Sequence, residues 1–224
     1  MQINTDFTRP VTIRGDRYHW VPSTQTGVER MMLDRIGDEK ARATTVVRYS
    51  PHSSFPNHAH PGGEEILVLS GTFSDNTGDY PTGWYLRNPP ASSHAPFSHQ
   101  GTTIFVKLWQ MRETEKETLR VDTNDPANWK VIEGRETCPL FCNPFESVSL
   151  QKVPALNLVC DLSLDATEIL VLTGSVKHDG ITYPQGSWLR LPKDSTATVT
   201  AEKQGATVFI KQGEFANIGS EATL

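Results

Sequence analysis

Two histidines and a glutamate stand within seven residues of one stretch of the chain. His58 and His60 are two positions apart, and Glu64 follows four residues later. In an extended strand, residues i and i+2 point to the same face, so both imidazoles can reach one ion from the same side. Imidazole nitrogen and carboxylate oxygen are typical ligands of zinc, iron, nickel, copper and manganese. The stretch therefore predicts half of a metal site.

The residues that follow the histidines predict a turn and then a strand. Proline fixes one φ and glycine accepts positive φ values, so the Pro-Gly-Gly sequence at 61–63 predicts a turn. The apolar run after it predicts a strand over 64–70, and Glu64 opens this strand beside the histidines. Glu65 points to the opposite face by strand alternation, which favours a structural role. Upstream, 28–36 and 41–49 predict two strands joined by a polar turn.

A second turn, strand and turn over 83–94 ends in a third histidine, His94. With the stretch at 58–71, its spacing resembles the two signature motifs of the cupins. Cupins are small antiparallel β-barrels or jelly rolls that hold a ligand pocket inside. The resemblance implies that the metal lies within such a barrel, partly shielded from water.

The resemblance to one cupin family is closer. The run at 58–71 resembles the ChrR-type cupin domain, as do the segments 79–81, 87–90, 92–94 and 105–108. In that family the matching positions coordinate one divalent metal ion, zinc in the best-known case, with iron, nickel and manganese as alternatives here. The resemblance implies a set of four ligands, called the ligand quartet below: His58, His60, Glu64 and His94. The chain departs from the general cupin pattern at Ala91, where Gly is usual, and at Ser98, where Asn is usual.

The chain also repeats its own strand and turn pattern. Residues 168–174 copy 65–71, residues 183–192 copy 80–89, and residues 208–211 echo 104–107. An internal repeat of this length predicts two units of the same architecture. The sequence therefore predicts an all-β chain with two tandem cupin domains, each a jelly-roll β-barrel.

The domain boundaries follow from the repeat and from a change in composition. We predict a metal-binding cupin domain with an N-terminal arm over 1–112 and a second cupin domain over 135–224. The segment 113–134 starts with a charge run and contains a turn cluster, which predicts a linker. The arm, residues 1–25, is expected to dock on a barrel or on a neighbouring subunit.

The second copy lacks the ligand pattern. At the positions of the ligand quartet it carries Asp161, Ser163, Thr167 and Ala197. The glycines, prolines and apolar strand residues are retained, so the ligands are separable from the scaffold. We expect no metal at this position in the second domain.

Composition limits the partners and the compartment. The formal net charge of −5 argues against a phosphate-binding surface, so nucleic acid is not an expected partner. No apolar run reaches the length of a membrane span, and the first residues lack the features of a signal peptide, which predicts a cytoplasmic protein. Cys138, Cys142 and Cys160 are typical of buried thiols rather than of a disulfide framework, with a three-thiol metal site as the alternative.

Two functions follow from the resemblance, and both stay open at this point. Full-length ChrR-type proteins are anti-sigma factors, in which a separate zinc-binding helical domain holds the sigma factor and the cupin half responds to oxidative stress. Residues 1–25 carry no Cys-rich zinc motif, so we expect a sensory or regulatory module that is related to anti-sigma factors but lacks the sigma-binding domain. Three histidines and a glutamate are also the ligands of cupin dioxygenases, which implies cleavage of a diketone or hydroxyketone bound in the first barrel. A purely structural metal is a third possibility, and both a monomer and a homodimer fit.

Overall fold

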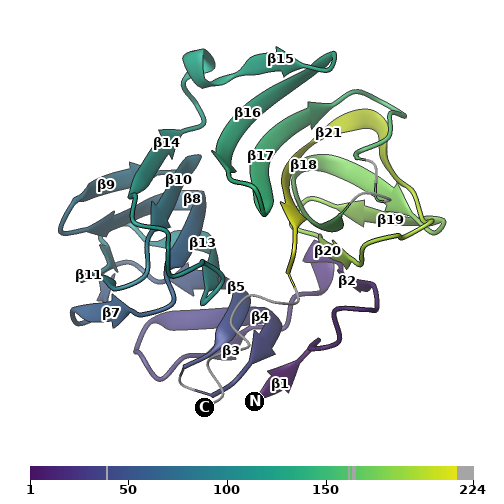
Figure 1. The fold of residues 1–224 in the computed structure, drawn as a ribbon. Helices are drawn as coiled ribbons and strands as arrows, with labels where there is room; N and C mark the ends of the chain where they lie inside the picture. Colours follow the sequence, from purple (N-terminus) through teal and green to yellow (C-terminus); the bar gives the residue numbers. More distant parts are fainter. Residues whose placement is uncertain (39, 161, 163–164, 216–224) are drawn as a thin grey trace. The chain divides into compact units, whose positions relative to one another are not determined.

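The computed structural model describes residues 1–38, 40–160, 162 and 165–215. Within these ranges the chain forms twenty-one β-strands and two short 3₁₀ helices, η1 (Gly15–Arg17) and η2 (Pro126–Asn128). Neither of these helices has the length and apolar character that a membrane crossing requires. The prediction of an all-β chain is confirmed, and the chain divides into two compact units (Figure 1).

Unit 1 consists, among the described residues, of Met1–Thr5 and His19–Asn124. Its strands are β1 (Gln2–Ile3), β3 (Val21–Pro22), β4 (Val28–Ile36), β5 (Arg42–Tyr49), β6 (Ser53–Ser54), β7 (His58–His60), β8 (Glu64–Asp75), β9 (Gly78–Pro81), β10 (Trp84–Asn88), β11 (Ser92–His94), β12 (Phe97–Ser98), β13 (Thr102–Leu108) and β14 (Leu119–Asp122). The strands predicted over 28–36 and 41–49 are β4 and β5.

The main sheet of unit 1 is antiparallel and runs in the order β1-β4-β5-β13-β8-β10-β14. A separate two-stranded ladder joins β7 to β11. Alternate residues of the central strands form the core, because apolar side chains on one face of a strand pack together. The residues between them, such as Tyr85 and Phe105, are buried on the opposite face. Ile66, Leu86, Ile104 and Val106 are members of this core.

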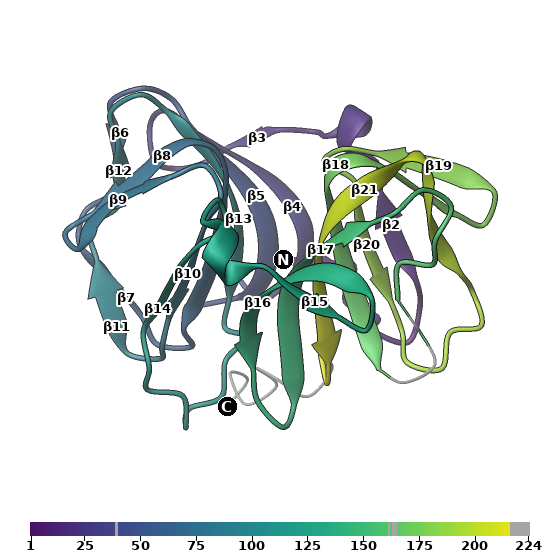
Figure 2. The same cartoon turned by 90° about the horizontal axis from the view of Figure 1, so that it is seen from above.

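Unit 2 consists of Asp6–Tyr18 and, among the described residues, 125–215. Its strands are β2 (Val11–Ile13), β15 (Lys130–Ile132), β16 (Arg135–Cys142), β17 (Glu146–Val153), β18 (Ala166–His178), β19 (Ile181–Pro184), β20 (Trp188–Leu191) and β21 (Val199–Gly213). The strand order is β15-β16-β17-β21-β18-β20-β2, and Figure 2 shows these strands from above.

The two units share one central arrangement. The order β5-β13-β8-β10 of unit 1 recurs as β17-β21-β18-β20 in unit 2, and β9 and β19 flank β8 and β18 in the same way. The predicted tandem repeat is confirmed at the level of strand order. In each main sheet the described strands at the two ends of the path are not paired with one another, so each unit is an open, curled sandwich rather than a fully hydrogen-bonded barrel.

Segments outside the repeat are distributed between the units. In the predicted linker 113–134, β14 pairs with β10 of unit 1, whereas β15 pairs with β16 of unit 2. The predicted N-terminal arm also has two destinations, since β1 pairs with β4 in unit 1 and β2 pairs with β20 in unit 2. Apolar periodicity identifies the repeated core strands, but it does not specify which sheet edge a short additional strand joins.

Candidate metal centre

Three short elements bring the ligand quartet together. His58 and His60 lie at the two ends of β7, and His94 ends β11. The antiparallel register places His94 directly opposite His58, so all three imidazoles come from one two-stranded ladder. Glu64 is the first residue of β8, immediately after the turn that follows β7.

The turn between the ligands requires its glycines. Gly63 has a φ of +75°, and its N–H donates to the carbonyl oxygen of His60 at 3.1 Å. A Cβ added to Gly62 would overlap the ring of Trp109. Glycine is therefore required once for backbone conformation and once for the close approach of an aromatic ring. The predicted turn at 61–63 is confirmed in this way.

The departure from the cupin pattern at Ala91 lies beside the same ladder. Ala91 has a φ of 70°, a region in which glycine is favoured over residues with a Cβ. Its N–H donates to the carbonyl oxygen of His60 at 2.9 Å, so the turn before His94 keeps its position despite the alanine. Ser98, the other departure, donates its hydroxyl to the Thr72 carbonyl oxygen at 2.6 Å.

The ligand atoms have the separations of a shared ion. Nε2 of His60 and Nε2 of His94 are 3.0 Å apart. Oε2 of Glu64 is 3.3 Å from Nε2 of His94 and 3.6 Å from Nε2 of His60. One nitrogen each of His58, His60 and His94 lie within 4.8 Å of one another. Ligands about 2.1 Å from a metal stand roughly 3.0 to 3.4 Å apart at octahedral to tetrahedral angles. The His60–His94 and Glu64–His94 separations match this range, and the Glu64–His60 separation is slightly longer.

Burial and charge set the protonation of the imidazoles. His60, Glu64 and His94 are buried, and His58 is half-buried. Burial lowers the pKa of His60, which favours the neutral imidazole that a metal requires. Burial also opposes a charge on His94, but its hydrogen bond to Asp75 and the nearby Glu64 carboxylate outweigh this and raise its pKa.

Two of the imidazoles have their second nitrogen anchored. Nδ1 of His94 lies 2.9 Å from Oδ2 of Asp75, and Nδ1 of His58 lies 2.9 Å from the carbonyl oxygen of Pro56. A proton on each Nδ1 satisfies these acceptors and leaves Nε2 with its lone pair free for the ion. Sequence reasoning missed Asp75, which had only the signal of a turn residue at the end of a strand.

Asp75 is itself held by the turn between β8 and β9. Its Oδ1 accepts hydrogen bonds from the backbone N–H and the hydroxyl of Thr77, at 2.7 and 2.6 Å. Burial alone would raise the pKa of Asp75, but the hydrogen bonds from His94 and Thr77 lower it to about 2. The carboxylate is therefore ionised at neutral pH and accepts only, which suits a partner of a metal-binding histidine.

The Glu64 carboxylate is positioned from the neighbouring strand. Asn88 lies opposite Glu64 in the ladder of β8 and β10, and its Nδ2 donates to Oε2 of Glu64 at 3.0 Å. Arg120, on β14, donates to Oδ1 of Asn88 at 2.8 Å and so fixes the orientation of the amide. Neither residue was predicted as part of the site.

Glu65 points away from the ligands, as strand alternation predicted. Its carboxylate accepts from the hydroxyl of Tyr85 at 3.1 Å and from the guanidinium of Arg87 at 3.2 Å. The equivalent position in unit 2, Glu168, accepts from Nε1 of Trp188 at 2.6 Å. The same buried pairing of a glutamate with an aromatic side chain in both units supports a role in the scaffold.

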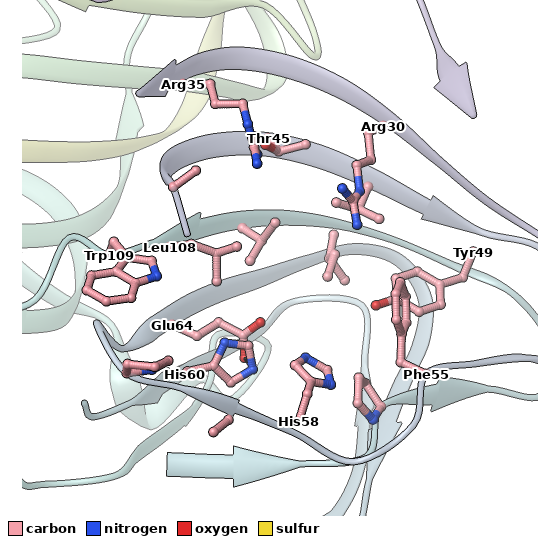
Figure 3. A pocket seen from close by; sticks show the side chains of 17 residues that line it. Arg30, Arg35, Thr45, Tyr49, Phe55, His58, His60, Glu64, Leu108 and Trp109 are labelled. Atoms are coloured by element: carbon pink, nitrogen blue, oxygen red, sulfur yellow. Dashed lines mark ion pairs between the residues drawn. The ribbon is translucent and has the colours of Figure 1, made fainter. Parts of the chain in front are cut away.

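A cavity of about 280 Å³ opens onto the ligand quartet. Figure 3 shows His58, His60 and Glu64 on one side of it and side chains of β4 and β5 on the other. The wall between them is largely apolar and comprises Ala41, Val47, Phe55, Pro61, Pro96, Ile104, Val106, Leu108 and Trp109. A small molecule in this cavity would reach three of the four ligands.

The second unit has a different interior at the corresponding positions. Thr167 is buried and accepts a hydrogen bond from Gln212, and Ala197 is half-buried. Asp161 and Ser163 lie outside the described residues. Apolar side chains such as Val208 fill the core of this unit. In the described part of the chain, the His/Cys/Asp/Glu cluster with metal-binding separations is the histidine group of unit 1.

Among the described residues, the three cysteines do not form a cluster. Cys138 is buried, Cys142 is exposed and Cys160 is half-buried. Burial raises the pKa of Cys138, which keeps the thiol protonated. The three-thiol metal site is not formed among the described residues.

Comparison with known proteins identifies the first part of the chain. Residues 8–112 match the family described as the ChrR cupin-like domain. The first part of the chain is similar to the ChrR cupin-like domain. This domain spans the ligand quartet, and the resemblance that the motifs carry is confirmed. No curated protein sequence matches the chain significantly.

Solved structures extend the likeness to both units. A candidate dioxygenase from Nostoc punctiforme superposes with a TM-score of 0.68 at 13% identity, over 98% of this chain and 85% of that one. Escherichia coli YhhW, a bacterial pirin in complex with nickel(II), superposes with a TM-score of 0.66 at 11% identity, over 91% of this chain and 98% of that one. Escherichia coli YlbA superposes with a TM-score of 0.69 at 10% identity, over 95% of this chain and 94% of that one. At these identities the likeness concerns the fold, and it confirms two tandem cupin units.

Proposed function

We propose that the ChrR cupin-like domain binds one divalent metal ion through the ligand quartet and acts on a small molecule held in the adjoining cavity. The observation that carries this proposal is the cavity of about 280 Å³ that borders His58, His60 and Glu64. Structural metal sites are closed by their protein ligands, whereas catalytic sites keep a position open to water or substrate. A ligand quartet beside a cavity favours the second kind.

The reaction class that fits best is oxidative cleavage of a diketone or hydroxyketone. Three imidazoles and one carboxylate are the ligand set of cupin dioxygenases, and the fold is shared with the candidate dioxygenase of Nostoc punctiforme. A bound metal would supply a Lewis acid for the two substrate oxygens and, as iron(II), the redox capacity to use O₂. In such a reaction one carbon–carbon bond is broken and both atoms of O₂ enter the two fragments.

The chain's own side chains bind and orient the substrate. The apolar wall excludes water and favours the carbon skeleton of a diketone. Tyr49, from β5, directs its hydroxyl into the cavity (Figure 3). Burial and the charge of Glu64 raise the pKa of Tyr49, so the hydroxyl stays protonated at neutral pH and donates a hydrogen bond to a substrate oxygen.

A regulatory function is the second candidate, and the match to the ChrR cupin-like domain favours it. In this case the metal would be zinc, and the cavity would hold the molecule whose presence is sensed. A sigma factor is not part of this proposal. A zinc-loaded chain without oxygen chemistry would therefore direct the search toward a different protein partner.

Elemental analysis paired with oxygen uptake distinguishes the two candidates. The protein is purified without added metal or chelator, its metal content is measured, and O₂ consumption is followed on a panel of diketones after iron(II) loading. We expect about one metal per chain and substrate-dependent uptake. His99→Ala is a matched control, because His99 is exposed and outside the ligand quartet. Zinc at the same stoichiometry without uptake would refute the enzyme and support the regulatory function.

A further inference from the structure

Two arginines of β4 enter the cavity from the side opposite the metal ligands. Arg30 and Arg35 both line it, and both are half-buried. Figure 3 shows their guanidinium groups directed into the cavity, with His60 and Glu64 across from them. The cavity thus has two ends of different chemistry, with an apolar wall between them.

A β-bulge makes it possible for both arginines to face the cavity. Arg30 and Arg35 are five positions apart in sequence, so in a regular strand their side chains would point to opposite faces. The ladder between β4 and β5 shifts register between Met32 and Asp34, where β4 carries one extra residue. This shift reverses the alternation and brings both arginines to the same side. Bulges are frequent beside functional sites, where they redirect a side chain in this way.

The two positive charges are poorly compensated by the protein. Within the described residues Arg30 forms no ion pair, and Arg35 donates to the backbone carbonyl oxygen of Asp38. Burial lowers the pKa of Arg35, the charge of Arg30 lowers it further, and the charge of Asp38 only partly opposes this shift. Half-buried like charges are costly unless an anion joins them.

The structure assigns to Arg30 and Arg35 a subsite for the anionic end of the substrate. The substrate class is then a small carboxylate whose other end carries the oxygens that chelate the metal. This inference rests on the proposed function and adds the charge of the substrate to it. The planar guanidinium groups match a carboxylate through paired N–H donors. A cavity of about 280 Å³ limits the substrate to a short chain between the two ends.

Two probes of nearly equal size test the charge of the substrate. Pentane-2,4-dione and 2,4-dioxopentanoate share a diketone and differ by the replacement of one methyl group by a carboxylate. Their affinities are measured by calorimetry on the zinc-loaded protein, in which they bind without being oxidised. The decisive quantity is the ratio of the two affinities in each variant.

We expect wild-type protein to prefer 2,4-dioxopentanoate, and Arg30→Gln and Arg35→Gln each to reduce this preference by about tenfold or more. Pentane-2,4-dione binding should change by less than about threefold, since it lacks the carboxylate. Arg30→Lys should retain part of the preference, because it keeps the charge and loses the paired donors. Arg48→Gln is the control, because Arg48 forms an exposed ion pair with Glu29 on the same two strands.

Metal content and thermal melts accompany each titration. An unchanged affinity ratio in folded, zinc-loaded Arg30→Gln and Arg35→Gln would overturn the anion subsite and leave the proposed function standing. Equal losses for both probes would also overturn it, since the arginines would then shape the cavity rather than bind a carboxylate. A wild-type chain that holds no metal would overturn the proposed function and this inference together.

Discussion

Replacing Asp75 by asparagine should damage the metal site without touching a ligand. Oδ1 of Asp75 accepts from the N–H and hydroxyl of Thr77 at 2.7 and 2.6 Å, and Oδ2 accepts from Nδ1 of His94 at 2.9 Å. In Asp75→Asn the amide oxygen must accept both hydrogen bonds that Thr77 donates. The amide nitrogen, itself a donor, therefore faces Nδ1 of His94.

The expected loss follows from the tautomer of His94. Two N–H donors do not hydrogen-bond to each other, so the imidazole adopts the tautomer with its proton on Nε2. Nε2 is the atom that lies 3.0 Å from Nε2 of His60 and 3.3 Å from the Glu64 carboxylate, and it then lacks a free lone pair for the ion. Loss of such a partner typically costs about 10- to 100-fold in metal affinity. Because the tautomer is inverted, we expect about 100-fold, which corresponds to about 2.7 kcal/mol.

Zinc affinity is measured by competition with a chromophoric chelator. The control is Asp79→Asn, the same substitution at an exposed position of β9. Circular dichroism of the metal-free proteins checks that both variants fold. Zinc binding by Asp75→Asn within about threefold of wild type, or an equal loss in Asp79→Asn, would refute the tautomer argument.

Three further substitutions test the division between site and scaffold. His60→Ala should remove most of the metal and leave the circular dichroism spectrum unchanged; an unfolded variant would mean that the site is structural. Glu65→Ala should lower the free energy of unfolding in urea by about 3 kcal/mol, because Tyr85 and Arg87 lose a buried partner, while metal content stays the same. A normal stability or a metal-free protein would contradict the scaffold role. Tyr49→Phe should weaken pentane-2,4-dione binding to zinc-loaded protein about fivefold by calorimetry, at unchanged metal content. Equal affinity would show that the hydroxyl does not contact the ligand.

The ligand positions could be predicted from sequence because their geometry is local. His58 and His60 share a face through the period of one strand, and the turn at 61–63 brings Glu64 beside them within seven residues. The repeat was visible for a similar reason, since apolar alternation and turn residues recur wherever the same strands are built. His94 had to be supplied by the resemblance, because the register that places it opposite His58 joins strands distant in sequence.

Only the tertiary structure decided what surrounds the ligands. Asp75 reaches His94 from the far end of β8, and Arg30 and Arg35 reach the cavity through a bulge that strand alternation in the sequence does not reveal. The same holds for the short strands β2 and β14, whose sheet edges are not encoded in their own residues. Pairing between distant strands depends on the register of whole ladders, and a one-residue shift changes which side chains face the cavity. Local sequence thus determined the candidate ligands His58, His60 and Glu64, whereas long-range pairing determined the residues around them, the charge of the cavity and the boundaries of the units.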